Sequence, residues 1–239
     1  MKSSLREHTF SAQDERVRSF AEFVRAHAPR AGDSFSVVDI GCGSGEQTLR
    51  VAQLFPQAKI YAFDISPSNI EKAQALVSGR PEATRIQFIC GDYLACSAPP
   101  AALIISDSCF HLISCEDTEL YTKLKHGLTP NGSVIFTVPY ACFYNSCIYL
   151  LRRGFKAMRS EALEGVVLRC ARLVYGDRHD DAFLRQRLPY LHLLPTRIDN
   201  GHFRQALGVH KLKVVHVRNE TRILGKPAQR CLVVQHRHA

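Results

Sequence analysis

The amino-acid sequence predicts an α/β protein in which a largely parallel β-sheet carries helices on both faces. Short apolar and β-branched segments recur along the chain, and segments with apolar residues at helical spacing separate them. The most informative segment is 37–46, where a buried strand runs into three alternating glycines and then into a helix. With 239 residues, 46% of them hydrophobic, the chain is long enough for one such domain with an insertion.

Composition and charge narrow the class of protein. The nine cysteines are scattered singly, without a C-x-x-C pair or paired Cys/His spacing, which is typical of free thiols in a reducing compartment and argues against a metal site. The first residues lack the apolar core of a signal peptide, and no run approaches the roughly 20 apolar residues of a membrane helix. We therefore expect a cytoplasmic protein without a membrane partner. The net charge of +9 is compatible with acidic small molecules or nucleic acid.

The first expected elements are a helix, a strand and a second helix. Residues 11–14 form a capping-box pattern ahead of apolar residues at helical spacing, and Pro29 ends this helix. Residues 35–38 form the first buried strand. Apolar residues at i, i+3, i+4 and i+7 then predict a helix over 47–55.

The glycine-rich turn between that strand and helix carries the first candidate site residues. Asp39 precedes Gly41, Gly43 and Gly45, and Cys42 lies among the glycines. Glycine allows positive φ and close approach of a ligand, and the helix N-terminus supplies unpaired N–H groups. Dinucleotide-binding turns favour G-x-G-x-x-G, whereas the spacing here is G-x-G-x-G. An acidic residue just before the turn suits a ligand with an ammonium group and no phosphate at this position.

Three further strands are expected, each followed by polar residues, and they span residues 59–63, 86–90 and 101–105. Asp64 follows the first of them about 20 positions after Gly41, the interval at which a carboxylate binds ribose hydroxyls. Gly91 and Asp92 follow the second, and the polar segment 106–111 follows the third. Open α/β sheets bind ligands at this edge, so these residues are candidates for a site.

In this order, the four segments resemble the motifs of the class I S-adenosylmethionine-dependent methyltransferases of the small-molecule type. The resemblance runs from residue 35 to residue 139, a little under half of the chain. It implies a Rossmann-like sheet of seven strands, six parallel and one antiparallel at the C-terminal end. The fifth strand is then expected at 133–138, and the last two at 212–217 and 230–235.

The resemblance also implies S-adenosyl-L-methionine as the cofactor. It places Asp39 near the methionine end, the backbone of residues 41–45 along the methionine and ribose, Asp64 at the ribose hydroxyls and Asp92 at the adenine amino group. Further candidates for the cofactor pocket are Cys42, Ile65, Tyr93 and Ser106. For Tyr93, a place in the hydrophobic core is an equal alternative to stacking near the adenine.

Two residues are candidates for catalysis if the reaction needs a base. His111 follows the fourth strand, and an unperturbed imidazole titrates near neutrality. Tyr140, at the end of the fifth strand, and His192 are candidates of second rank. A helix-flanking histidine without a catalytic role is the alternative for His111.

We expect a single methyltransferase domain over residues 1–239. Its parts are an N-terminal helical cap (1–30), a cofactor-binding half (35–139), a helical substrate lid inserted after the fifth strand (140–208) and the final two strands (209–239). The lid is rich in arginines such as Arg152 and Arg153. They either bind a carboxylate or phosphate of the substrate or form a solvated surface.

The sequence thus predicts an enzyme that transfers a methyl group to an oxygen or nitrogen atom of a small molecule. One alternative is an RNA or ribosome methyltransferase, although aromatic residues do not alternate with the basic residues of the lid. Another is a protein that binds the cofactor without methyl transfer. A dehydrogenase ranks last, because Asp39 would repel a pyrophosphate. We expect a small-molecule partner and no nucleic acid, and the oligomeric state stays open, a dimer included.

Overall fold

The computed structural model describes residues 14–28, 34–157, 165–170, 172, 193–220 and 226–237. The strands are β1 (Phe35–Ile40), β2 (Ala58–Asp64), β3 (Ile86–Cys90), β4 (Ala101–Ser106), β5 (Leu128–Pro139), β6 (Leu212–Asn219) and β7 (Gln229–His236). The helices with defined bounds are α2 (Asp14–His27), α3 (Glu46–Leu54), α4 (Pro67–Val77), α5 (Asp117–Gly127), α6 (Phe143–Ala157) and α9 (Gly201–Val209). Two 3-10 turns, η1 (Pro81–Arg85) and η2 (Phe110–Leu112), precede β3 and follow β4.

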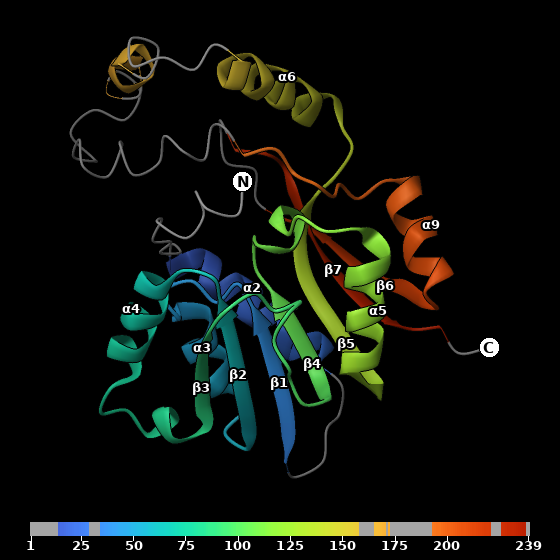
Figure 1. Ribbon diagram of the computed structural model, residues 1–239. Coiled ribbons are helices and arrows are strands. Elements are labelled where there is room, and N and C mark those ends of the chain that lie inside the picture. The colour runs from blue at the N-terminus through green and yellow to red at the C-terminus, as the bar shows by residue number, and fades with distance from the viewer. Residues whose placement is uncertain are drawn as a thin grey trace.

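The strands form one seven-stranded sheet of order β3-β2-β1-β4-β5-β7-β6 (Figure 1). The pairs from β3 to β5 are all parallel, whereas β7 runs antiparallel to both β5 and β6. The predicted sheet, with six parallel strands and one antiparallel strand, is therefore confirmed. Strand order reverses after β1, so the carboxyl ends of β1 and β4 border the crevice in which such sheets bind ligands.

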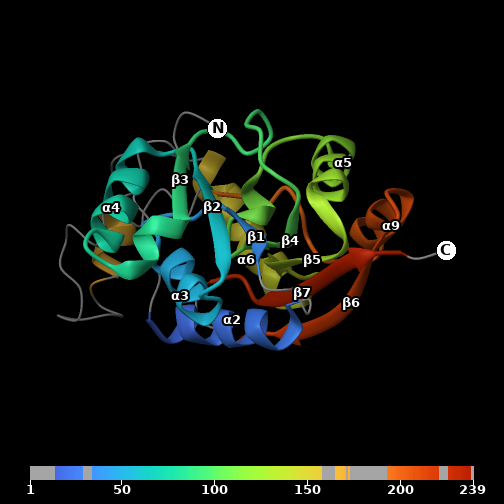
Figure 2. The same cartoon turned by 90° about the horizontal axis from the view of Figure 1, so that it is seen from below.

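Helices cover both faces of the sheet, with α2 and α3 on one side and α5 and α9 on the other (Figure 2). On the α5 side, Val38 and Phe136 of the strands pack with Leu120 of α5 and Phe203 of α9. Successive side chains of a strand point to opposite faces. The neighbour of Val38, Val37, accordingly belongs to the second core.

The second core lies under α2 and α3. Val37 and Leu103 pack there with Phe20 of α2 and Val51 of α3, and all four are at most 1% exposed. Burial on both faces explains why the centres of β1 (Val37 and Val38) and β4 (Leu103 to Ile105) are apolar without alternation. The N-terminal helix is thus part of the core of the fold, since burying a side chain such as Phe20 contributes roughly 1.5–3 kcal/mol.

The fifth strand starts earlier than the sequence predicted. Leu128 pairs with Ala101, and the next pair joins Ser133 to Leu103, so the register shifts between them. Residues 129–132 are an irregular excursion within β5. The backbone N–H and C=O pairing of Leu128 with the start of β4 extends the strand beyond the predicted residues 133–138.

Helix α6 lies beyond the carboxyl ends of the parallel strands (Figure 1). Its first turn is fixed by Asn145, which is 1% exposed. The Asn145 amide donates to the carbonyl oxygens of Tyr140 (2.7 Å) and Ala228 (2.9 Å), and its oxygen accepts from Ala228 N (2.7 Å). These three bonds tie α6 to the ends of β5 and β7.

The range predicted as a lid, 140–208, contains elements of two kinds. Helix α6 lies above the sheet, whereas α9 packs Phe203 and Leu207 into the core beside α5. The last residues of the predicted lid are therefore part of the layer that covers the sheet. Within the described residues, no helix combines the length and the apolar character needed to cross a membrane.

Candidate active site

The glycine turn after β1 is held in a conformation that favours glycine. Gly41, Gly43 and Gly45 have φ values of 76°, 57° and 87°. The backbone N–H groups of Gly41 and Cys42 donate to the carbonyl oxygen of Phe63 at 2.8 and 3.0 Å, which ties the turn to the end of β2. The turn is thus set by backbone contacts of the chain itself.

Two of these glycines also lack room for a side chain. A Cβ at Gly41 would lie 2.3 Å from Cys109 Sγ, and a Cβ at Gly45 would lie 2.8 Å from Ala73 Cβ. Gly45 is the N-cap of α3 and makes no side-chain cap. The backbone of the turn therefore lies close to neighbouring groups. A turn that binds a ligand through its backbone requires such close approach.

Asp64 at the end of β2 is the carboxylate that organises this edge. Its Oδ2 accepts from Gly43 N (2.9 Å), and its Oδ1 accepts from Ser66 N (2.9 Å) and from Asn69 Nδ2 (3.1 Å). Each carboxylate oxygen has more than one acceptor position. Asp64 is half-buried, as is Ile65 beside it, so the carboxylate links the glycine turn to the start of α4 at a partly accessible position.

Asp39 lies beneath the turn and is 2% exposed. Its pKa is raised from 3.8 to about 7, mainly by burial. The hydrogen bond from Thr48 Oγ1 (2.6 Å) lowers this pKa, and the charges of Asp107 and Asp64 raise it by smaller amounts. Near neutral pH the carboxyl is therefore balanced between its neutral and charged forms, and a cation at this position would favour the charged form.

We predict that the Asp39 carboxyl makes the free energy of unfolding depend on pH. Its pKa is higher in the folded than in the unfolded chain, so the stabilisation is complete below pH 4 and is lost as pH rises through 7. Urea unfolding at pH 5 and pH 8 should show a loss of about 2–3 kcal/mol that Asp39→Asn removes. An Asp39→Asn variant with the same pH dependence as the unchanged protein would contradict the prediction.

Four carboxylates converge on Cys109, the residue that packs against Gly41. Burial, followed by the charges of Asp64, Asp39, Asp92 and Asp107, raises the pKa of the Cys109 thiol to about 12. The carboxylates come from the ends of β1, β2, β3 and β4. The surroundings of Cys109 are consequently acidic, which suits a ligand with ammonium or sulfonium groups.

Three other predicted cofactor residues have contacts within the chain. Asp92 Oδ1 accepts from Leu94 N at 3.1 Å and shapes the turn after β3. Tyr93 is 5% exposed, and its ring lies in the hydrophobic core 5.6 Å from the ring of Phe63, while a place near the adenine stays a prediction. Ser106 is fully buried and donates to Ile40 O at 2.9 Å, so it holds β4 against β1 and does not face the pocket.

A polar cluster at the ends of β4 and β5 joins Asp107 and Ser108 of the predicted segment 106–111 to residues that the sequence did not single out. Asp107 Oδ1 accepts from Arg16 Nη2 (2.8 Å) and from Thr137 Oγ1 (2.9 Å). Thr137 Oγ1 accepts from Ser108 N (2.6 Å), and Ser108 has a φ of 59°. Arg16 also donates to the Ser108 hydroxyl and, at 2.9 Å, to Gln229 Oε1. A non-glycine residue with positive φ among buried polar groups is typical of a functional site.

The predicted catalytic residues lie on either side of this cluster. His111 is 8% exposed, and within the described chain its Nδ1 has no hydrogen-bond partner. Burial, followed by the charges of Arg16 and Arg152, lowers its pKa to about 3, against a hydrogen bond with the backbone of Thr137 that raises it. The Tyr140 ring lies under Arg230, whose Cζ is 4.0 Å from the ring centroid. His192 lies outside the described residues. A catalytic role for His111 or Tyr140 stays a prediction.

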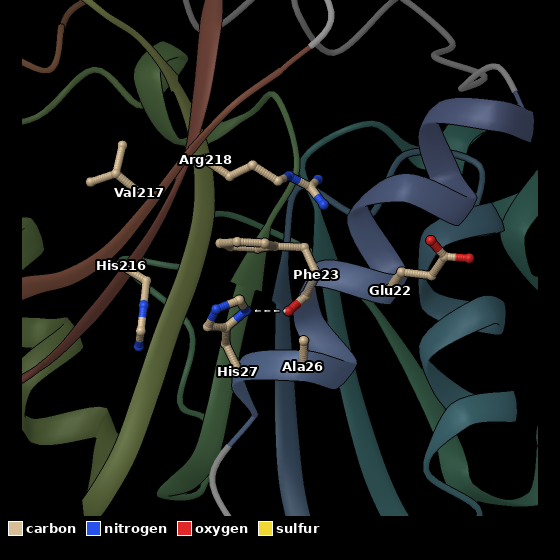
Figure 3. A pocket seen from close by; sticks show the side chains of 7 residues that line it. All are labelled: Glu22, Phe23, Ala26, His27, His216, Val217 and Arg218. Carbon is tan, nitrogen blue, oxygen red and sulfur yellow. Dashed lines mark hydrogen bonds between the residues drawn. The ribbon is translucent and has the colours of Figure 1, made fainter.

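A separate depression of about 380 Å³ lies between α2 and β6 (Figure 3). The rings of His27 and His216 are 4.6 Å apart there, and Arg218 Cζ lies 4.5 Å from the centroid of the Phe23 ring. None of the residues that the sequence singled out lines it. We therefore place the candidate active site at the glycine turn.

The comparison with protein families decides what this arrangement belongs to. Residues 37–132 match the model of a methyltransferase domain. This matched part of the chain, residues 37–132, is a methyltransferase domain of the class I S-adenosylmethionine-dependent kind. The predicted family and the predicted cofactor, S-adenosylmethionine, are thereby confirmed, and the positive-φ glycine cradle and the acidic pocket fit that cofactor.

Curated relatives of this methyltransferase match over part of their length. It is 30% identical over 127 residues to the trans-aconitate 2-methyltransferase of Streptomyces avermitilis, which is 53% of this chain and 47% of that protein. It is 35% identical over 107 residues to the malonyl-(acyl-carrier protein) O-methyltransferase of Halalkalibacterium halodurans, which is 43% of this chain and 38% of that protein. The chain thus spans less than half the length of these two relatives.

Solved methyltransferase structures share the fold. PKMT2 from Rickettsia typhi in complex with AdoHcy superposes with a TM-score of 0.64 at 15% identity, over 97% of this chain and 54% of that chain. The magnesium protoporphyrin IX methyltransferase from Synechocystis with bound SAH gives a TM-score of 0.58 at 15% identity, over 92% of this chain and 81% of that chain. At such identities the likeness establishes the fold alone.

Proposed function

We propose that the protein transfers the methyl group of S-adenosylmethionine to an oxygen or nitrogen atom of a small molecule. The observation that carries this proposal is the bond between Gly43 N and Asp64 Oδ2 (2.9 Å), which joins the glycine turn to the ribose-binding carboxylate of the family. The chain therefore holds both halves of a cofactor cradle in register at the carboxyl edge of the sheet.

We assign the roles of the residues as the family resemblance implies them. Asp64 offers its remaining acceptor positions to the ribose hydroxyls, and Asp39 faces the cationic methionine end. Asp92 is assigned to the adenine side. Its charge, like that of Asp64, raises the pKa of the Cys109 thiol. When bound, S-adenosylmethionine supplies a methyl group on a sulfonium, which is a good leaving group. The protein then has to place the acceptor in line with that methyl group and exclude water.

The names of the relatives support a small acidic acceptor. One is named for trans-aconitate and the other for a malonyl group with O-methylation. Carboxylic acids are common to both names. The side of the pocket away from the glycine turn, formed by η2 and α6, is the place where this chain would discriminate among such acceptors.

The proposal is tested first by calorimetric titration with S-adenosylmethionine and, in parallel, with NADH. We expect micromolar binding of the first alone. The protein is then incubated with methyl-labelled S-adenosylmethionine and either the small-molecule fraction or the RNA of a cell extract. Label in the small-molecule fraction is expected. Label in the RNA would overturn the small-molecule assignment, and cofactor binding without transfer to either fraction would leave a binding protein.

A further inference from the structure

Three buried polar atoms near α6 have no hydrogen-bond partner in the described part of the chain. They are His111 Nδ1, Tyr149 Oη and Arg152 Nε. Buried polar groups without a partner are rare, because each one has lost its hydrogen bonds to water without a replacement. Two of the three lie on α6, one turn apart, and the third follows β4 at the carboxyl edge of the sheet.

The three groups are neighbours. The charge of Arg152 lowers the pKa of His111. Burial raises the pKa of the Tyr149 hydroxyl, and the charge of Arg152 opposes this rise. The segment 193–196 joins the two elements. Arg152 Nη1 donates to Leu193 O at 3.0 Å, and the carbonyl oxygen of His111 accepts from Thr196 N at 2.8 Å. Helix α6 and η2 therefore border one polar space.

The two arginines whose charges act on His111, Arg16 and Arg152, differ in their pairing. Arg16 is paired with Asp107 at 2.8 Å, so its charge is balanced inside the protein. Arg152 is half-buried, and no carboxylate of the described chain pairs with it. A guanidinium that is removed from water without a counter-ion is unfavourable, and an anion from outside the chain would relieve it.

We propose that Arg152, Tyr149 and His111 form the binding site for a carboxylate group of the acceptor. The inference rests on the proposed methyl transfer and names its substrate class. Arg152 Nε and the Tyr149 hydroxyl are two donors that a carboxylate accepts. The one N–H of the neutral His111 ring is engaged with the backbone of Thr137, so His111 borders the site without donating to the carboxylate. A dianionic phosphate fits less well, because one guanidinium balances one charge.

A carboxylate acceptor, which has no proton to lose, is consistent with the neutral state of the His111 ring. Burial holds the His111 pKa at about 3, so the ring is neutral near pH 7 and too weak a base to take a proton efficiently from an alcohol. A carboxylate oxygen needs no base. It donates its electron pair to the methyl carbon while the C–S bond breaks and its pair passes to sulfur, so no proton is released. In this assignment His111 and Arg152 position the acceptor and transfer no proton.

The test measures acceptor binding without turnover. Malonate, trans-aconitate and benzoate are titrated calorimetrically into the protein saturated with S-adenosylhomocysteine. We expect at least one of these acids to bind and its neutral methyl ester not to bind. Arg152→Gln should weaken that acid at least 10-fold, and Tyr149→Phe about 2–10-fold, as for one hydrogen bond. Arg153→Gln, next to Arg152 but exposed, is the matched control and should bind like the unchanged protein.

Each outcome decides between the two proposals. Failure of S-adenosylhomocysteine to bind would overturn the proposed function and not the anion site. Binding of S-adenosylhomocysteine with no binding of any of the three acids would overturn the anion site, as would equal affinity of Arg152→Gln and Arg153→Gln. Tyr149→Phe conserves the shape of the ring, so it provides the answer if Arg152→Gln does not fold.

Discussion

The Gly41→Ala variant is expected to lose measurable cofactor binding and to unfold at a lower urea concentration. Gly41 has a φ of 76°, and the new Cβ would lie 2.3 Å from Cys109 Sγ and 2.4 Å from Cys109 Cβ. Backbone strain costs about 1–3 kcal/mol, and overpacking costs about 1–3 kcal/mol more. Because the turn lines the cradle, its displacement moves Gly43 away from Asp64. Urea unfolding and titration with S-adenosylhomocysteine measure the two effects.

The structure offers a matched control for this substitution. Gly79 has nearly the same φ, 74°, but no atom lies within 4 Å of a Cβ placed there. Gly79→Ala should therefore show the strain alone, with unchanged cofactor affinity. Cys109→Gly should restore part of the stability lost in Gly41→Ala, because it removes both atoms of the clash. Equal losses in Gly41→Ala and Gly79→Ala would show that the contact with Cys109 has no effect.

The fold was predictable because its determinants are local. Each parallel strand is a short apolar run, and each is followed by its polar residues at the same edge, so the order of motifs specified the sheet. The start of β5 was predicted five residues too late because Leu128 joins the strand only through its pairing with Ala101. That pairing depends on a register shift between distant segments, which no local pattern carries.

The candidate site was predictable only where one motif holds all the partners. Asp64 meets Gly43 and Ser66 within its own βαβ unit. The cluster around Asp107 was missed because Arg16 and Gln229 are 213 positions apart and meet only in the folded sheet. The Tyr93 ring packs against Phe63 of the neighbouring strand β2. Only this packing distinguishes a place in the core from a place in the cofactor site, and the sequence does not show it.

We expect Asp64→Ala to weaken the binding of S-adenosylhomocysteine by about 10²-fold, the loss that follows from removing a charged hydrogen-bond partner of about 1.5–3 kcal/mol. The carboxylate has two tasks. It would accept from the ribose, and it holds the N–H groups of Gly43 and Ser66 at 2.9 Å each. Without it, both N–H groups lose their acceptor, so the glycine turn is released at the same time as the ribose contact is lost. Calorimetric titration measures the affinity.

The exposed carboxylate of Glu71, on the adjoining helix α4, is the control for a general loss of negative charge. Glu71→Ala should bind S-adenosylhomocysteine like the unchanged protein. Asp64→Asn should lie between the two, because the amide keeps one acceptor oxygen and turns an NH2 toward the donors on the other side. An Asp64→Ala variant with the affinity of Glu71→Ala would remove Asp64 from the cofactor site. The acidic pocket would then have to bind the cofactor through Asp39 and Asp92 alone.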